Sequence, residues 1–355
     1  MRLYIQYTYK QLEKQAQNVQ KGTDLGAVGS VPTAPSQEEK SMANEVIVMK
    51  NVSKEFKVLN RHEGLKGSFQ DLFSRDYKTV KAVNDVSLTV EKGEIIGYLG
   101  PNGAGKSTTI KMMTGVLEPS TGDIQVNGLV PYKDRTRNSE NIGVVFGQRS
   151  QLWWNLPLIE SFKLLRDIYM VPEKDYKDML ELYRSLVDIE PILHKPVRQM
   201  SLGQRTLSDI LAAFLHNPGI VFLDEPTIGL DVSMKAKIRE LIHGLNEVKE
   251  TTVILTTHDM GDVDALCKRI IIIDEGKKIY DNDIDHLKTY FGSYRTLRMR
   301  LEDGSWDEQV IDEKKTDVMH VIQETQKKHK IKDIQLEEIS TEEVIRKIYE
   351  GSKAS

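Results

Sequence analysis

Short runs of apolar residues recur along the middle of the chain and alternate with segments whose apolar residues follow helical spacing. The runs lie at residues 94–99, 142–146, 220–223, 252–256 and 270–274. Their length fits strands that are buried on both faces. The helical segments lie at residues 158–169, 176–187, 201–216 and 233–248. This alternation is typical of a parallel sheet covered by helices on both sides, and it predicts an α/β fold.

The region before residue 94 has a different pattern. Residues 46–49 and 80–90 have strand character and are separated by a polar insertion at 57–77. Residues 122–128 form a third candidate strand, which ends in an Asn-Gly turn. We therefore expect an antiparallel β unit beside a mixed sheet core.

The pattern also divides the chain into three parts. Residues 1–41 contain a stretch rich in Gly, Pro and Ser with few large apolar residues, and we expect them to be a disordered extension. Residues 42–290 form the main α/β domain, with a helical subdomain inserted at about 150–217. Residues 291–355 combine a half-exposed strand with two amphipathic helices, which predicts a small accessory α/β domain.

Composition and charge narrow the classes of function. The chain has 355 residues and a formal net charge of −4, which does not favour a nucleic-acid partner. The single cysteine, Cys267, excludes an internal disulfide. No apolar run approaches the roughly 18 residues that a membrane span requires. A role at a membrane would therefore depend on a partner protein.

A glycine-rich stretch follows the apolar run at 94–99 and precedes a helical segment at 107–114. It matches the phosphate-binding pattern G-x-x-x-x-G-K-[ST] over Gly100, Pro101, Asn102, Gly103, Ala104, Gly105, Lys106 and Ser107. Glycines let the backbone turn its N–H groups toward phosphate oxygens. The lysine supplies a charge for the β- and γ-phosphates, and the serine hydroxyl can ligate Mg²⁺. The flanking strand and helix support a nucleoside triphosphate site, because the helix N-terminus points at the phosphates.

Two carboxylates end the apolar run at 220–223. Asp224, at the tip of a strand beside the phosphate loop, can hold Mg²⁺ directly or through water. Glu225 would then lie where it can polarise a water for attack on the γ-phosphate. Alone the pair would indicate only a solvated strand end, but its place downstream of the phosphate loop favours the catalytic interpretation.

Residues 200–204, Met-Ser-Leu-Gly-Gln, open the helical segment at 201–216. A serine hydroxyl and backbone N–H groups at a helix N-terminus can bind an anion, and the same serine can simply cap the helix. The residue types alone leave both interpretations open.

Five motifs occur together in an order and spacing that resemble ABC-type ATPase cassettes. They are the phosphate loop, residues 200–204, 223–227, 229–231 and 257–259. The resemblance covers about residues 46–285, and the whole set is far more specific than any single motif. The stretch departs from the family's Leu-Ser-Gly-Gly-Gln pattern at two positions, Met200 and Leu202, and the departure that matters is Leu202 in place of the first glycine. This departure bears on the rate of hydrolysis and not on the fold.

The resemblance implies roles within one cassette. Thr108 would join the phosphate loop in binding ATP, and Glu225 would be the catalytic base. Gln148 would reach Mg²⁺ and the attacking water, with Gln151 as a competing assignment. His258 would be the switch histidine that contacts the γ-phosphate.

Further roles follow from the head-to-tail dimer of this family, in which two cassettes sandwich ATP. The residues Ser201, Gly203 and Gln204 would contact nucleotide from the opposite cassette. Asp231 would communicate across the dimer. Phe56 would stack on adenine, with Tyr77 as its rival.

Local features also resemble the ATP-binding subunits of ABC-2-type exporters. These are the insertion at 57–77, the stretch at 146–154 and the C-terminal helix. The resemblance implies a homodimer bound to a separate polytopic permease, at the cytoplasmic face of the membrane, with ATP and Mg²⁺ as cofactors. The alternative is a soluble ABC ATPase that acts on ribosomes, nucleic acid or a signalling partner. The residues Trp153, Trp154 and Leu156 are either core of the helical subdomain or part of a groove for the permease.

Overall fold

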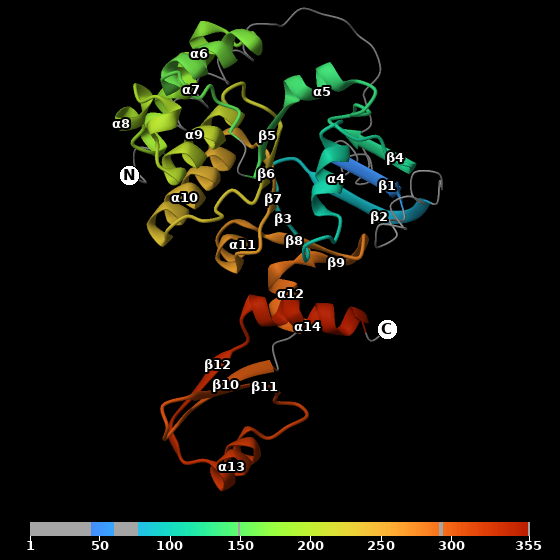
Figure 1. The fold of residues 1–355 in the computed structure, drawn as a ribbon, viewed down its shortest axis with the longest axis vertical. Coiled ribbons are helices and arrows are strands. Elements are labelled where there is room, and N and C mark those ends of the chain that lie inside the picture. The colour runs from blue at the N-terminus through green and yellow to red at the C-terminus, as the bar shows by residue number, and fades with distance from the viewer. Residues whose placement is uncertain (1–43, 60–76, 148–149, 291–293, 354–355) are drawn as a thin grey trace, which may run out of the picture. The chain divides into compact units, whose positions relative to one another are not determined.

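The computed structural model describes residues 44–59, 77–147, 150–290 and 294–353, which belong to one unit, and the extension predicted at 1–41 lies outside these residues. A six-stranded sheet with the order β5-β6-β7-β3-β8-β9 lies at its centre (Figure 1). Its strands are β3 (Ile95–Leu99), β5 (Ile142–Phe146), β6 (Ile220–Asp224), β7 (Thr252–Thr256), β8 (Arg269–Asp274) and β9 (Lys277–Asp283). All neighbours run parallel except β8 and β9, which confirms the predicted α/β class with a mixed sheet.

Both faces of this sheet are buried, because successive side chains of a strand point to opposite faces. In β6, Val221 and Leu223 join one apolar cluster while Ile220 and Phe222 join another. The side chains of β3 and β8 are divided between the same two clusters. A strand buried on both sides cannot show polar alternation, which explains the continuous apolar runs in the sequence.

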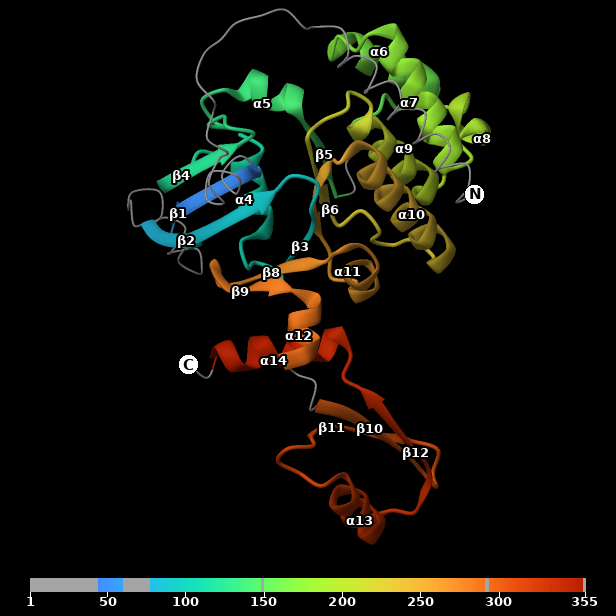
Figure 2. The ribbon, with the colours of Figure 1, turned by 180° about the vertical axis from the view of Figure 1, so that it is seen from behind.

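Helices cover one face and a second sheet covers the other, as Figures 1 and 2 show. The helices on the first face include α6 (Leu158–Ile168), α7 (Glu173–Leu186), α8 (Glu190–Leu193), α9 (Leu202–Phe214), α10 (Val232–Lys249) and α11 (Met260–Leu266). The opposite face packs against α4 (Lys106–Met113) and a three-stranded antiparallel sheet. A short helix, α5 (Arg135–Asn141), precedes β5 and was not predicted.

The antiparallel sheet has the order β2-β1-β4, with β1 (Glu45–Leu59), β2 (Tyr77–Glu91) and β4 (Thr121–Val126). Its first two strands are longer than predicted. Residues 57–59 were assigned to the polar insertion, but they continue β1 and pair with residues 77–79 of β2. Backbone pairing extends this ladder although the side chains of residues 57, 58 and 77–79 are exposed and give no apolar pattern. Residues 60–76 lie outside the described residues.

The C-terminal residues form a further antiparallel sheet with the order β11-β10-β12. Its elements are β10 (Tyr294–Leu301), β11 (Trp306–Asp312), β12 (Ile331–Glu338) and the helix α13 (Val318–Lys328). A helix α12 (Ile284–Tyr290) leads into it, and α14 (Thr341–Lys353) ends it. Val344 and Ile345 of α14 are buried in the large cluster that also contains residues of α11 and α12. Helix α14 therefore packs against α11 and α12.

Within the described ranges, no helix is both long enough and apolar enough to cross a lipid bilayer.

Candidate functional site

The phosphate loop connects the end of β3 to the start of α4 and is tightly enclosed. Gly105 has a φ of 106°, and a Cβ atom there would lie 2.3 Å from the carbonyl oxygen of Ala82 in β2. A Cβ atom at Gly100 would lie 2.4 Å from the carbonyl oxygen of Ile273 in β8. The glycines are therefore required by close backbone approach, as well as by the need to turn N–H groups inward.

Lys106 is the first residue of α4, and its side chain folds back along the loop. Its ammonium group donates hydrogen bonds to the carbonyl oxygens of Gly100 at 2.6 Å and Pro101 at 3.1 Å. Burial lowers the pKa of Lys106, and the nearby carboxylates of Glu225 and Asp224 oppose that shift. The loop thus places a half-buried cation among acceptors, an arrangement that favours the binding of anionic oxygens.

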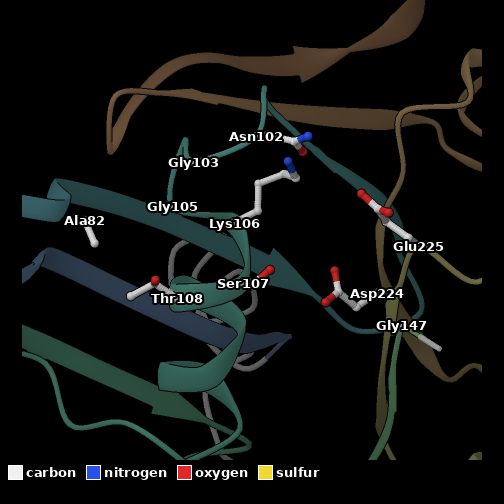
Figure 3. Close-up of a pocket in the computed structure, with 10 residues that line it drawn as sticks. All are labelled: Ala82, Asn102, Gly103, Gly105, Lys106, Ser107, Thr108, Gly147, Asp224 and Glu225. Carbon is white, nitrogen blue, oxygen red and sulfur yellow. The ribbon is translucent and has the colours of Figure 1, made fainter. Parts of the chain in front are cut away.

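A cavity of about 330 Å³ opens in front of this loop. Figure 3 shows Ser107 and Thr108 on α4 on one side and the two carboxylates from the end of β6 on the other. Its lining residues are Ala82, Asn102, Gly103, Gly105, Lys106, Ser107, Thr108, Gly147, Asp224 and Glu225. The structure therefore brings together the phosphate loop and both predicted carboxylates, which are more than a hundred residues apart in the sequence.

The carboxylates are held by the neighbouring strand. The hydroxyl of Thr256, at the end of β7, donates to Oδ1 of Asp224 at 2.5 Å. Glu225 has a φ of 51°, in the left-handed region, and its N–H donates to the carbonyl oxygen of Thr256 at 2.9 Å. This bond stabilises a backbone conformation that is unusual for a glutamate.

His258 follows β7 and lies beside Glu225. Its Nδ1 atom is 3.5 Å from Oε1 of Glu225, and its side chain is mostly exposed. Both residues line a second cavity of about 190 Å³, together with Thr227, Gly229, Lys235 and their neighbours. The predicted base and the predicted switch histidine are therefore adjacent.

The residues predicted to contact a second cassette lie at helix N-termini, and none of them lines the phosphate-loop cavity. Ser201 caps α9 in a capping box: its hydroxyl accepts from the N–H of Gln204, whose side chain accepts from the N–H of Ser201. A Cβ atom at Gly203 would lie 2.6 Å from Cγ of Met234 in α10. Asp231 caps α10, because its carboxylate accepts from the N–H of Met234 at 2.9 Å.

The remaining candidates have different outcomes. Phe56 of β1 pairs with Val80 of β2, and neither Phe56 nor Tyr77 lines the cavity. Gln148 lies outside the described residues. The rival assignment, Gln151, is bound to α9: its backbone N–H donates to Oδ1 of Asp209 at 3.1 Å.

Sequence reasoning missed three residues around the cavity, namely Ala82, Gly147 and Thr256. Gly147 directly follows β5, so its place after an apolar strand was a usable signal. Ala82 lies on β2, where its carbonyl oxygen closely approaches Gly105, and its residue type gives no signal of this contact.

Comparison with known proteins agrees with this geometry. The ABC transporter family model matches residues 83–228. The ABC transporter ATP-binding protein NatA of Bacillus subtilis is 36% identical over 215 residues, which are 61% of this chain and 87% of that protein. The cholesterol transporter ABCA5 of Rattus norvegicus is 30% identical over 289 residues, 81% of this chain but 17% of that protein.

A solved structure shares the fold and bears on the reaction. It is the dimeric post-hydrolysis state of the ATP-binding cassette MJ0796 bound to ADP and Pi, with a TM-score of 0.55 and 26% identity over 67% of this chain and 98% of that one. The phosphate loop, the paired carboxylates and the adjacent histidine of the present chain fit the same chemistry. The chain therefore belongs to the ABC transporter family, as an ATP-binding cassette that hydrolyses ATP.

Proposed function

We propose that this chain is the ATPase subunit of a transporter in which it dimerises on ATP and drives a separate ABC-2-type permease, in the direction of export. The observation that carries the proposal is the cavity that unites Lys106, Ser107, Asp224 and Glu225, with His258 next to Glu225. The permease and the direction rest on the local resemblance to ABC-2 exporters and on the transporter names of the relatives.

The cavity fits a nucleoside triphosphate with Mg²⁺. Lys106, the N-terminus of α4 and the turned loop backbone supply positive charge for phosphate oxygens. Ser107 and Asp224 offer hard oxygen ligands from opposite sides of the cavity. Among the described residues, no group of three or more His, Cys, Asp or Glu side chains is arranged to hold a metal, which fits an ion held largely by phosphate and water. Bound there, Mg²⁺ would neutralise charge on the phosphate oxygens.

Hydrolysis would then depend on Glu225 and His258. Glu225 would take a proton from the attacking water. The oxygen of this water would bond to the γ-phosphorus while the bond from the γ-phosphorus to the β–γ bridging oxygen breaks. His258 would orient the γ-phosphate and keep Glu225 in place. Gln148 would approach the water and the metal, as the family resemblance implies.

A second copy of the chain would complete the site. Ser201, Gly203 and Gln204 lie at the N-terminus of α9, outside the phosphate-loop cavity, and Ser201 is exposed there, which supports contact of this helix end with a nucleotide held by another protomer. Asp231 at the start of α10 would transmit closure between protomers. Phe56 is proposed as the adenine contact and Tyr77 as its rival, because both side chains are exposed on the antiparallel sheet.

The permease would dock on the exposed tryptophans that precede α6. Trp154 is 51% exposed and Trp153 is 38% exposed, and exposed aromatic residues are typical anchors of protein interfaces. The guanidinium group of Arg205, on α9, lies 4.6 Å from the ring centre of Trp154. A permease helix bound to Trp154 would therefore act directly on α9. This placement would hold the chain at the cytoplasmic face of a membrane.

The first test uses Glu225→Gln, which should bind ATP but hydrolyse it slowly. The variant is purified with its native partners from detergent-solubilised membranes in the presence of ATP, and the co-purifying proteins are identified. A polytopic membrane protein in about equal amount is the expected result. Recovery only with ribosomes, nucleic acid or a soluble protein would instead establish the alternative function and overturn the transport proposal.

A matched pair of tryptophan variants tests the docking surface. Trp154→Ser should reduce recovery of the permease at least about tenfold, as expected for an interface anchor. Trp306→Ser is the control, because Trp306 is similarly exposed at 47% but lies on β11 of the C-terminal sheet. Equal recovery with both variants would remove Trp154 from the interface.

A further inference from the structure

Asp262, on α11, is a fully buried carboxylate that receives hydrogen bonds from three other segments. Its exposed fraction is 0%. Its Oδ2 atom accepts from the hydroxyls of Thr227 and Thr257, the latter at 3.0 Å. Its Oδ1 atom accepts from Nε of Arg239, on α10, at 2.6 Å. A buried carboxylate requires such partners, because an unpaired charge would be costly to bury.

The two threonines stand next to the residues proposed to carry out hydrolysis. Thr227 follows Glu225 by two positions, and Thr257 immediately precedes His258. The two segments come from the ends of different strands, β6 and β7. One carboxylate oxygen therefore joins the segment of the base to the segment of the histidine.

A second set of hydrogen bonds holds Asp259, the residue that follows His258. Asp259 accepts from Nζ of Lys235 on α10, and its own N–H donates to the hydroxyl of Thr257 at 2.9 Å. Arg239 also approaches Asp259, at 3.5 Å. Both neighbours of His258 in the sequence are thus anchored, while the histidine ring itself remains exposed.

We propose that Asp262 is a positioning residue for ATP hydrolysis, whose carboxylate sets the spacing between Glu225 and His258 and whose charge is balanced by Arg239. The inference rests on the roles proposed above for Glu225 and His258. Asp262 lines neither the phosphate-loop cavity nor the cavity beside His258, so it acts through the two threonines and touches no substrate.

The test is a double-mutant cycle between Asp262→Asn and His258→Ala in the full-length chain. Steady-state phosphate release gives kcat, and a fluorescent ATP analogue gives the dissociation constant. We expect Asp262→Asn to lower kcat about tenfold while the dissociation constant changes less than about twofold, because the interaction is used only in the hydrolytic step. In the His258→Ala background, the same change should lower kcat by less than about twofold.

Asp281→Asn is the matched control. Asp281 also pairs with an arginine, Arg269, at 2.9 Å, and its side chain is largely buried, but it lies on β9. This variant should keep the wild-type kcat. If Asp262→Asn fails to fold, Thr257→Val is used instead, because valine has a similar shape to threonine and only one hydrogen-bond donor to Asp262 is removed. This variant should also lower kcat in the wild-type background and much less in the His258→Ala background.

The outcomes distinguish failure of the inference about Asp262 from failure of the proposed role of His258. If the fall in kcat of the double variant equals the product of the falls in the two single variants, the positioning role of Asp262 is overturned and the role of His258 is left intact. An unchanged kcat in His258→Ala would overturn the role of His258 and the present inference with it. Equal losses of kcat and ATP affinity in Asp262→Asn would assign Asp262 to the general stability of the fold.

Discussion

Oε1 of Glu225 lies 3.5 Å from Nδ1 of His258, although the two residues follow different strands of the central sheet. Each is held through its backbone or its immediate neighbours. The N–H of Glu225 is bound to Thr256, and Thr257, beside His258, is bound to Asp262. The backbone around both residues is therefore anchored, while their side chains remain able to contact a nucleotide.

Removal of the histidine should separate binding from hydrolysis. We expect His258→Ala to lower kcat about 10- to 100-fold, because the γ-phosphate and Glu225 lose a positioned partner, while ATP affinity changes little. The measurement is phosphate release beside equilibrium binding of a fluorescent ATP analogue.

The chain offers a closely matched control for this prediction. His243 forms a pair with Glu247 on α10 at the same 3.5 Å separation, on an exposed helix surface. His243→Ala should retain the wild-type kcat. A comparable fall in both variants would show that any histidine–glutamate pair affects the assay and would remove the specific role of His258.

The phosphate loop should tolerate no side chain at Gly105. Gly105→Ala would place a methyl group 2.3 Å from a carbonyl oxygen, in a backbone conformation that alanine disfavours. We expect ATP affinity to fall at least about tenfold, because the loop must shift away from β2.

Gly128→Ala separates this effect from backbone strain alone. Gly128 has a φ of 72° in the turn after β4, and no atom of the described residues lies within 4 Å of an added Cβ. It should cost about 1 kcal/mol of unfolding free energy and leave ATP affinity unchanged. Thermal unfolding and nucleotide binding, measured on both variants, distinguish steric exclusion from the conformational penalty.

The sequence predicted the central sheet well for a physical reason. Strands such as β6 are buried on both faces, so their residues must be apolar throughout and the pattern is unambiguous. Strand β12 is the opposite case. Most of its residues are exposed, and charged positions conceal its alternation, so neither β12 nor β11 was predicted.

The site shows the same division between local and long-range information. The phosphate loop and Asp224 could be predicted because their motifs carry their own strand or helix context. Ala82 and Thr256 could not, because an alanine and a strand threonine acquire a role only through pairing with distant segments. The buried Asp262 was equally invisible, since its partners lie on α10 and on two separate loops.

Asp209 should make the stability of the chain depend on pH in the acidic range. It is almost fully buried on α9, where its carboxylate accepts from Ser150 and from the N–H of Gln151. Burial raises the pKa of Asp209 to about 6, against the opposing effect of these hydrogen bonds. An acid with a raised pKa in the folded state contributes stability below its unfolded pKa, near 4, and this contribution is lost as pH rises through about 6.

The difference between wild type and Asp209→Asn isolates this residue, since other groups such as the partly buried His216 titrate in the same pH range. Relative to the variant, the unfolding free energy of wild type should decrease by about 1–3 kcal/mol between pH 4 and pH 7. Denaturant unfolding across that range is the measurement. A constant difference would mean that the pKa of Asp209 is not raised.

Helix α14 should depend on Val344 for its attachment to α11 and α12. Val344 has an exposed fraction of 0% in the cluster that includes α11 and α12, and the hydroxyl of Thr341 donates to Asp264 of α11 at 2.7 Å. Val344→Asp would bury an unpaired carboxylate, at a cost of about 3–5 kcal/mol, so the helix should detach. Hydrogen exchange should then show loss of protection across α14, while the central strands stay protected.

Ile334→Asp, at a 41% exposed position of β12, is the control and should leave α14 protected. Because α11 begins two residues after His258, detachment should also lower kcat. An unchanged kcat with a detached helix would show that α14 stabilises the fold without acting on the segment that carries His258.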